Sequence, residues 1–215
     1  VHASVVVAVL NQKTIVMDQD VDILFRTQDP FDTDIPNMNF DIEGGRVLGT
    51  DPATTLAVYN FSQSTDTNAS GEKDFTSQSY GQYVFDIPDT AAYEFWKITP
   101  EGATTTEYDA LPGTSTEVKA IFLDKAIASL KATIVRSDDG SAVTGATVRI
   151  SNTTLAYDET VTTDSFGVAY FPKTITPLTP GDYDIEIQAT GFQTETDTVT
   201  IGSALTKQTF DLVAN

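Results

Sequence analysis

Polar and apolar residues alternate with a period of two through the second half of the chain, the pattern of strands with one buried and one solvated face. The alternation is clearest in Tyr183-Asp-Ile-Glu-Ile-Gln188. Similar strand patterns recur at residues 130–135, 145–150, 168–171, 195–201 and 207–213. Clusters of Gly, Pro and Asp, such as Pro180-Gly181, separate them and are typical of tight turns. This spacing predicts an antiparallel β-sandwich over residues 127–215.

A phrase of sequence occurs twice, as TSQSYGQYVF at Thr76–Phe85 and as TTDSFGVAYF at Thr162–Phe171. A period of about 90 residues is too long for a solenoid or propeller unit and equals one small all-β domain. Residues 38–126 are therefore predicted to be a second, looser copy of the sandwich, with Asn39–Gly45 as its first strand. Because Asp124–Ser129 is too short for a flexible tether, the two sandwiches should form a stiff rod.

Residues 1–37 have no place in either copy and are predicted to form an N-terminal β-strand arm. Residues 4–10 are a continuous apolar run, typical of a strand covered on both faces, and residues 14–25 alternate. Two strands alone are marginal in water, so the arm must add to a sheet, either in its own first domain or in a neighbouring subunit. The second option makes a polymer interface of Val5, Val6, Val7, Val9 and Leu10. A head-to-tail contact of this kind does not close and propagates into a fibre.

The charge of the chain excludes two classes of partner. The 215 residues carry a net charge of −19 with only 12 Lys and Arg, so the surface repels nucleic acid and anionic lipid. No apolar run approaches the ~20 residues needed to cross a bilayer, so membrane insertion is not expected. The first residue is Val1 rather than Met, which we interpret as a secreted chain whose leader was removed, although a trimmed fragment would look identical. There is no Cys, so neither disulfides nor thiol chemistry contributes.

Four turn motifs in the second half carry a family resemblance: Asp139–Val148, Thr162–Gly167, Leu178–Tyr183 and Ala189–Phe192. In order and spacing they resemble the carboxypeptidase regulatory-like (transthyretin-like) domain and the related collagen-adhesin B-type repeat, over residues 129–215. The resemblance implies a seven-stranded prealbumin-like (Ig-like) sandwich that serves as a spacer, stalk or accessory module on secreted or surface proteins.

One departure from the adhesin repeats matters. The repeats that form a Lys–Asn isopeptide bond place a Lys inside the first strand and an acid in a central strand. Here the apolar run 132–135 contains no Lys, and Ile187 stands roughly at the acidic position, so no crosslink is expected. Lys131 and Asn215 are the only candidate pair.

Catalysis is poorly supported, and we predict that the chain is not an enzyme. The single His, His2, lies at the terminus, where it cannot readily complete a Ser-His-Asp arrangement. The 31 acids offer many carboxylate pairs by chance, and nothing in their spacing selects one for glycoside chemistry.

One acidic cluster is a candidate metal site. Asp18, Asp20 and Asp22 share one face of a predicted strand, with neighbours roughly 6–7 Å apart from the strand rise. Carboxylate oxygens of this kind suit calcium. The alternative is a solvated charged face that blunts a sheet edge.

Aromatic residues and sequons complete the candidate sites. Trp96 should point away from Tyr93 and Phe95, so that with Tyr80 and Tyr83 it could stack on a sugar or pack on a neighbouring subunit. The alternative is that Trp96 covers the arm of its own domain.

Three triplets fit the N-glycosylation sequon, at Asn60, Asn68 and Asn152.

These observations support two classes of function. The first is a structural subunit of an extracellular or cell-surface filament, pilus-like, which joins copies of itself by exchange of the N-terminal strand. The second is a surface adhesin or carbohydrate-binding accessory module that recognises a glycan or host surface. A virion tail or decoration protein is a variant that the sequence does not separate from the first.

Overall fold

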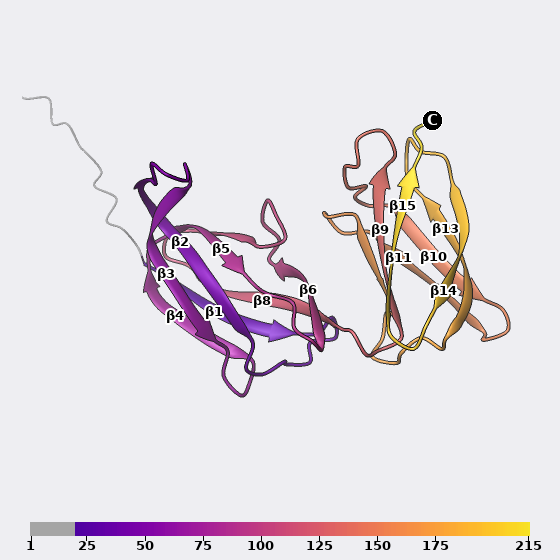
Figure 1. Cartoon of the computed structure of the whole chain (residues 1–215), viewed down its shortest axis with the longest axis horizontal. Coiled ribbons are helices and arrows are strands. Elements are labelled where there is room, and N and C mark those ends of the chain that lie inside the picture. Colours follow the sequence, from indigo (N-terminus) through magenta and orange to yellow (C-terminus); the bar gives the residue numbers. More distant parts are fainter. Residues whose placement is uncertain (1–19) are drawn as a thin grey trace, which may run out of the picture.

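A computed structural model describes residues 20–215, which form two β-sandwiches in series (Figure 1). The strands of the first are β1 (Val21–Gln28), β2 (Asn39–Thr50), β3 (Ala57–Asp66), β4 (Glu72–Gln78), β5 (Gly81–Asp86), β6 (Tyr93–Thr99), β7 (Glu107–Ala110) and β8 (Ser115–Asp124). Those of the second are β9 (Ser129–Arg136), β10 (Thr147–Asn152), β11 (Tyr157–Thr162), β12 (Val168–Phe171), β13 (Gly181–Gln188), β14 (Glu195–Ile201) and β15 (Leu205–Leu212). The predicted all-β fold is confirmed.

The two sandwiches share one strand order. The sheets of the first are β4-β1-β8-β6 and β3-β2-β5-β7, and those of the second are β12-β9-β15 and β11-β10-β13-β14. In each, the leading strand (β1 or β9) pairs antiparallel with one neighbour and parallel with the last strand (β8 or β15). The first sandwich differs by one added edge strand, β6, which pairs antiparallel with β8.

Each sandwich has its own apolar core, built from the inward residues of the alternating strands. In the first, Phe25 stacks on Phe85 with ring centroids 4.9 Å apart and lies 4.2 Å from Phe40. In the second, Ile134 and Ile187 are among the fully buried residues. The apolar alternation read from the sequence is thus the pattern of burial.

The boundary of the first sandwich lies earlier than the sequence suggested. Residues 1–37 were predicted to be an arm that adds to a sheet of its own first domain or of a neighbouring subunit. In the described part of this segment, β1 lies hydrogen-bonded between β4 and β8 of its own first sandwich. Its inward residues Val21, Ile23 and Phe25 belong to the first core, and burial of these side chains holds the strand there. The leading strand of this sandwich is therefore β1, and Asn39–Gly45 lies within the second strand, β2.

The two sandwiches do repeat one strand order, but the repeated phrase in the sequence does not mark corresponding strands. Thr76–Phe85 and Thr162–Phe171 do not correspond, because the former spans β4–β5 and the latter β11–β12. The corresponding turns are Thr67–Gly71 and Thr163–Gly167, each of which connects the third strand of its sandwich to the fourth. The error arose because the Ser-Tyr-Gly and Ser-Phe-Gly triplets look alike.

Hydrogen bonding in these two turns is the same. The side chain at the second position, Asn68 or Asp164, accepts bonds of 2.8–3.0 Å from the backbone N–H groups two and four residues later. The final Gly71 and Gly167 both adopt positive φ, at 70° and 73°. Their carbonyls accept from the leading strand, at 2.9 Å from Thr27 and 2.7 Å from Ile134. The turn therefore anchors the leading strand in both sandwiches.

A buried tyrosine marks the same position in each fifth strand. Tyr83 and Tyr183 are almost fully buried, and each hydroxyl donates to the backbone carbonyl four residues earlier, at Ser79 and Thr179. Burial raises the pKa of Tyr83 to about 12. The Gly-x-Tyr sequence that begins β5 and β13 is the signal that gives the correct alignment of the repeat.

Replacement of Gly167 tests the anchoring role of the turn. A Cβ at Gly167 would lie 2.5 Å from the carbonyl oxygen of Ile134, whereas one at Gly140, with nearly the same φ of 71°, meets nothing within 4 Å. Gly140→Ala should cost about 1–2 kcal/mol from positive φ alone. Gly167→Ala should cost a further ~1–3 kcal/mol from the clash, measured by denaturant unfolding. Equal losses in the two variants would contradict the account.

Candidate functional site

The junction between the sandwiches holds the most specific arrangement of polar side chains. The linker between β8 and β9 contains only residues 125–128. The N–H of Lys125 donates to the carbonyl of Ala92 in the first sandwich at 2.8 Å, and its own carbonyl accepts from Leu205 of the second at 3.2 Å. The carbonyl of Ala128 accepts from Leu178 at 2.9 Å. A linker bonded to both bodies cannot serve as a free hinge.

Side chains of the added strand β6 contact both sandwiches. Tyr93 and Phe95 pack against the first core, where both rings meet Phe122 edge-on. Trp96 points elsewhere, and its ring lies 5.8 Å from Tyr170 of the second sandwich. The prediction that Trp96 points away from Tyr93 and Phe95 therefore agrees with the structure. It contacts the second sandwich, and it also lines a groove together with Pro30 and Phe31 of residues 1–37.

Glu94 of β6 is a buried carboxylate shared by two lysines of the second sandwich. It is 6% exposed, and its two oxygens accept from Lys131 Nζ at 2.9 Å and from Lys207 Nζ at 2.8 Å. Burial alone would raise the pKa of Glu94, but hydrogen bonds from Lys207 and Lys131 outweigh it and lower the pKa. The same contact raises the pKa of Lys207. A carboxylate this buried needs both cations to offset its desolvation.

A second ion cluster joins β6 to the turn Thr163–Gly167 of the second sandwich. Lys97 Nζ lies 2.9 Å from Asp164 Oδ2, while Asp164 Oδ1 accepts from the backbone of its own turn. Lys97 also pairs with Glu101, which in turn accepts from the hydroxyl of Ser165. Burial raises the pKa of Glu101, but the bonds from Lys97 and Ser165 outweigh it and lower the pKa. The turn that anchors β9 is thus also held by the first sandwich.

Aromatic rings line the junction beside these charges. The Phe31 and Tyr170 rings lie 6.4 Å apart, and Lys97 Nζ lies 4.8 Å from the Trp96 ring, within range of a cation–π contact. The indole N–H of Trp96 is buried and has no hydrogen-bond partner among residues 20–215. The tryptophan is therefore held by packing rather than by its polar edge.

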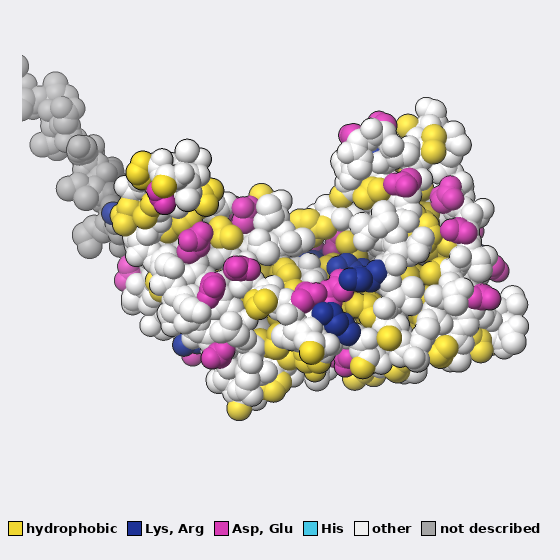
Figure 2. Space-filling model, viewed as in Figure 1, with side chains coloured by type: hydrophobic (Ala, Val, Ile, Leu, Met, Phe, Trp, Pro, Cys, Tyr) yellow, Lys and Arg dark blue, Asp and Glu magenta, His cyan; other side chains and the backbone are white. Residues whose placement is uncertain are grey.

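An open groove of about 570 Å³ runs between the sandwiches beside this contact, with the size of a small-molecule site. Its lining includes Pro30, Phe31, Trp96, Val161 and Pro172. In Figure 2, basic and acidic side chains gather between the two lobes, next to apolar surface.

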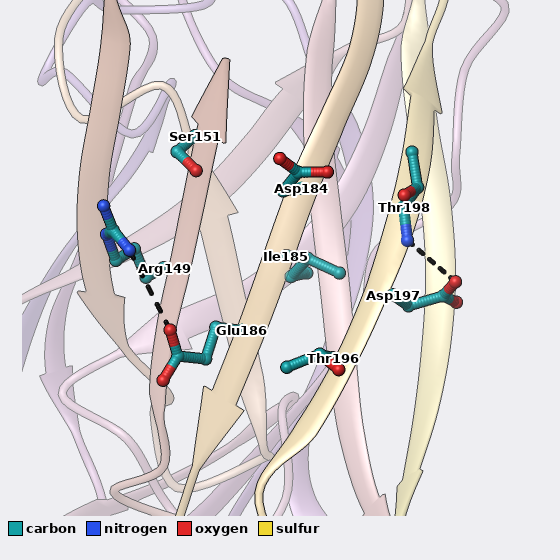
Figure 3. Close-up of a pocket in the computed structure, with 8 residues that line it drawn as sticks. All are labelled: Arg149, Ser151, Asp184, Ile185, Glu186, Thr196, Asp197 and Thr198. Carbon is teal, nitrogen blue, oxygen red and sulfur yellow. Dashed lines mark hydrogen bonds and ion pairs between the residues drawn. The ribbon is translucent and has the colours of Figure 1, made fainter. Parts of the chain in front are cut away.

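Another depression lies on the solvent face of the sheet that contains β10, β13 and β14 (Figure 3). Its polar lining centres on Arg149, which lies 2.7 Å from Asp158 and 3.9 Å from Glu186. Asp184 stands on the same face. The cation is satisfied by neighbouring carboxylates, and the arrangement provides no nucleophile activated by a base.

The predicted polymer and metal residues are only partly within the described part of the chain. Val5, Val6, Val7, Val9, Leu10 and Asp18 all lie outside it. Asp20 and Asp22 are exposed, and Asp22 accepts from the backbone N–H of Ser77 at 2.9 Å. Residues 20–215 contain no group of three or more His, Cys, Asp or Glu placed to hold a metal ion. Calcium at the three aspartates stays a prediction.

The three aromatics proposed as one contact surface do not come together. Tyr83 is fully buried in the first core, which corrects its assignment to a surface. Tyr80, 37% exposed, precedes β5 in one sheet, whereas Trp96 lies on the edge strand of the other.

The sequon asparagines have structural roles. Asn60 and Asn152 donate through their side-chain amides to Ser79 Oγ and to the carbonyl of Asp182, both at 2.8 Å. Asn68 holds its turn through Oδ1. Glycosylation at these positions stays a prediction.

Sequence reasoning missed the ion pairs at the junction. Lys131 was considered only as a partner of Asn215, but it pairs with Glu94, and Asn215 donates to the carbonyl of Phe192. One signal was present: Glu94 is an acid within the apolar strand Tyr93–Ile98. Its partners, however, lie in a different domain and could not be identified by spacing.

Removing the charge of Glu94 should loosen the junction. In Glu94→Gln, one amide oxygen must serve two ammonium groups, and stability should fall by about 1–3 kcal/mol, since Lys207 remains hydrated. Small-angle scattering should show a broader range of particle dimensions. The matched control Asp158→Asn, in an exposed pair, should change stability by less than about 0.5 kcal/mol and leave the dimensions unaltered. Identical behaviour of the two variants would refute the role of Glu94.

The junction should loosen as the pH falls. The folded pKa values of Glu94 and Glu101 lie below the ordinary 4.5, so their contribution is complete above that pH and is lost as pH falls through the lowered values. Scattering profiles should be constant from neutral pH down to about pH 5 and should broaden below about pH 4. If the dimensions stay constant down to the pH at which the sandwiches unfold, these carboxylates do not hold the angle.

No helix in residues 20–215 has the length and apolar character needed to cross a membrane.

Several pilins are among the solved structures to which this chain is similar. A streptococcal ancillary pilin is 15% identical with a TM-score of 0.37, over 94% of this chain and 64% of its own. The minor pilin of Streptococcus agalactiae is 12% identical with a TM-score of 0.34, over 90% and 96%. A shaft pilin of Lactobacillus rhamnosus GG is 9% identical with a TM-score of 0.31, over 93% and 98%. This chain spans less than two thirds of the ancillary pilin. With TM-scores below 0.5, none of these likenesses indicates what this chain does.

The sequence comparisons concern the second sandwich. No curated protein matches the chain. The family model of the carboxypeptidase regulatory-like domain matches residues 129–213, which are β9 to the end of β15. The match does not extend to residues 38–126, so a second copy of the family there stays a prediction.

Proposed function

We propose that this chain is a non-catalytic structural subunit of an extracellular or cell-surface filament, in which the two sandwiches act as one stiff unit. The observation that carries this proposal is the buried carboxylate of Glu94, held by Lys131 and Lys207 of the other sandwich. A spacer must keep a fixed angle between its domains, and a buried ion pair favours one geometry over others. Such a contact would oppose motion of one domain relative to the other.

Other features of the junction support the same role. Several contacts cross it, among them the linker hydrogen bonds, the Glu94 cluster, the Lys97–Asp164 pair and the Trp96–Tyr170 ring contact. The net charge of −19 favours solubility in a secreted or surface-exposed setting. In this proposal the groove between the sandwiches serves contact with other subunits rather than catalysis.

The position of β1 supports assembly through the preceding residues. β1 runs parallel to β8, so its first residues lie beside Ser115 at the end of the first sandwich away from the junction. The described chain therefore begins at a free end of the rod (Figure 1). In the proposed filament, residues 4–10 of one subunit add as a strand to an open sheet edge of the next.

The adhesin alternative has less support. A sugar-binding surface needs exposed aromatic rings on one face. Trp96 packs on Tyr170, Tyr83 is buried, and Tyr80 precedes β5 of the other sheet. No observation favours a glycan or a host surface over a second copy of the chain.

Replacement of residues 1–12 by a Gly/Ser segment of equal length tests the assembly step. The replaced chain should lose the fibres that the parent chain forms, because the donated strand is gone, while its thermal unfolding should stay the same. Negative-stain images and sedimentation velocity measure the two states. A matched control with Gly/Ser at residues 1–3 alone should assemble normally. Fibres from the fully replaced chain would show that the arm is not the linker.

A further inference from the structure

The β2–β3 hairpin extends beyond the body of the first sandwich. β2 pairs with β5 only as far as Gly45, opposite Gln82, while its pairing with β3 continues to Thr50. Residues 46–58 therefore form a two-stranded projection, which we call the ribbon. Figure 1 shows it at the end of the sandwich away from the junction. The turn is closed by the carboxylate of Asp51, which accepts from the N–H of Ala53 at 2.8 Å.

The ribbon carries large apolar side chains into solvent. The exposed fractions are 67% for Leu48 and Leu56, 55% for Val47 and 43% for Val58. Scattered apolar residues on a surface are ordinary, but four on thirteen residues of a projecting hairpin form a patch. Because a lone two-stranded unit is marginal in water, a partner that covers these side chains would stabilise the ribbon.

A complementary surface exists on the same chain. The groove between the sandwiches is concave, and Phe31, Trp96 and Val161 are apolar residues of its lining. At one side it continues into a small hollow that includes Ile175, which is 69% exposed. A convex apolar ridge and a concave apolar groove can bury each other's surface without a change in the fold.

Charge also matches between the two surfaces. Lys173 lies in the lining of the groove and forms no ion pair with another described residue. In a chain with 31 acids and 12 basic residues, such a cation is uncommon. The ribbon carries a half-buried carboxylate, Asp51, near its tip. An acidic tip beside a basic rim steers the approach of the ridge to the groove.

We propose that the ribbon of one copy of this chain seats in the groove between the sandwiches of a second copy. This inference rests on the proposed function, since it names a subunit contact of that filament. Ribbon and groove lie at different places on the molecule, so the contact is heterologous and each copy keeps one surface of each kind free. The contact therefore propagates, and it fixes the lateral position of a neighbour that the arm alone would only tether.

Two complementary variants test the contact, each built in the chain with residues 1–12 replaced by Gly/Ser so that strand exchange cannot contribute. The ribbon variant is Leu48→Asp with Leu56→Asp, and the groove variant is Thr160→Glu with Lys173→Glu. All four positions are exposed, so the fold should survive, as thermal unfolding would verify. The matched control is Leu155→Asp, an exposed leucine on a turn that does not line the groove.

Sedimentation velocity should show self-association of the arm-replaced parent and of the Leu155→Asp control. Each variant alone should associate at least tenfold more weakly. An equal mixture of the two should form a 1:1 heterodimer that grows no further, because one intact ribbon meets one intact groove. A monomeric mixture, or variants that associate like the parent, would overturn the inference.

The two proposals fail separately. Fibres that require residues 1–12, together with a mixture that stays monomeric, would leave the filament role in place and remove the ribbon contact. A heterodimer in the mixture, together with fibres that do not need residues 1–12, would retain the ribbon contact and remove strand exchange.

Discussion

The carboxylate of Glu94 is the constraint on which the arrangement of this molecule depends. It lies on a strand of the first sandwich, and both cations that offset its burial belong to the second. Separation of the sandwiches would break the hydrogen bonds and ion pairs that Glu94 makes with Lys131 and Lys207. The short linker and the Trp96–Tyr170 contact act in the same direction, but either could tolerate some rotation. In the proposed stiff unit, the ion pair favours one angle over others.

The added strand explains why the junction can exist. Both sandwiches share one strand order, and β6 is the element by which they differ. Its inward residues complete the first core, while Glu94, Trp96 and Lys97 contact the second sandwich. Asp164 lies in the turn that anchors β9, so this salt bridge ties the first sandwich to the leading strand of the second. One edge strand thus serves a core and an interface together.

The sequence predicted much of the fold because alternation and turn chemistry are local. Strands such as Tyr183–Gln188 and the turn at Thr163–Gly167 could be read directly. The register of the repeat could not, since Tyr80-Gly81 resembles Phe166-Gly167 although the two precede different strands. The sequence left open whether the segment that contains β1 pairs in its own domain or in a neighbouring subunit, because a parallel pairing with β8 joins residues some ninety positions apart. The Glu94 site depends on three strands of two domains, and no spacing along the chain indicates it.

The most direct test of the account is the distance distribution between spin labels in the two sandwiches. The chain has no Cys, so single cysteines at exposed Ser64 and Thr196 can be labelled without side reactions. A rigid junction predicts one narrow distance peak at neutral pH that broadens in Glu94→Gln. A broad distribution in the unaltered chain would contradict the claim that the buried ion pair fixes the angle.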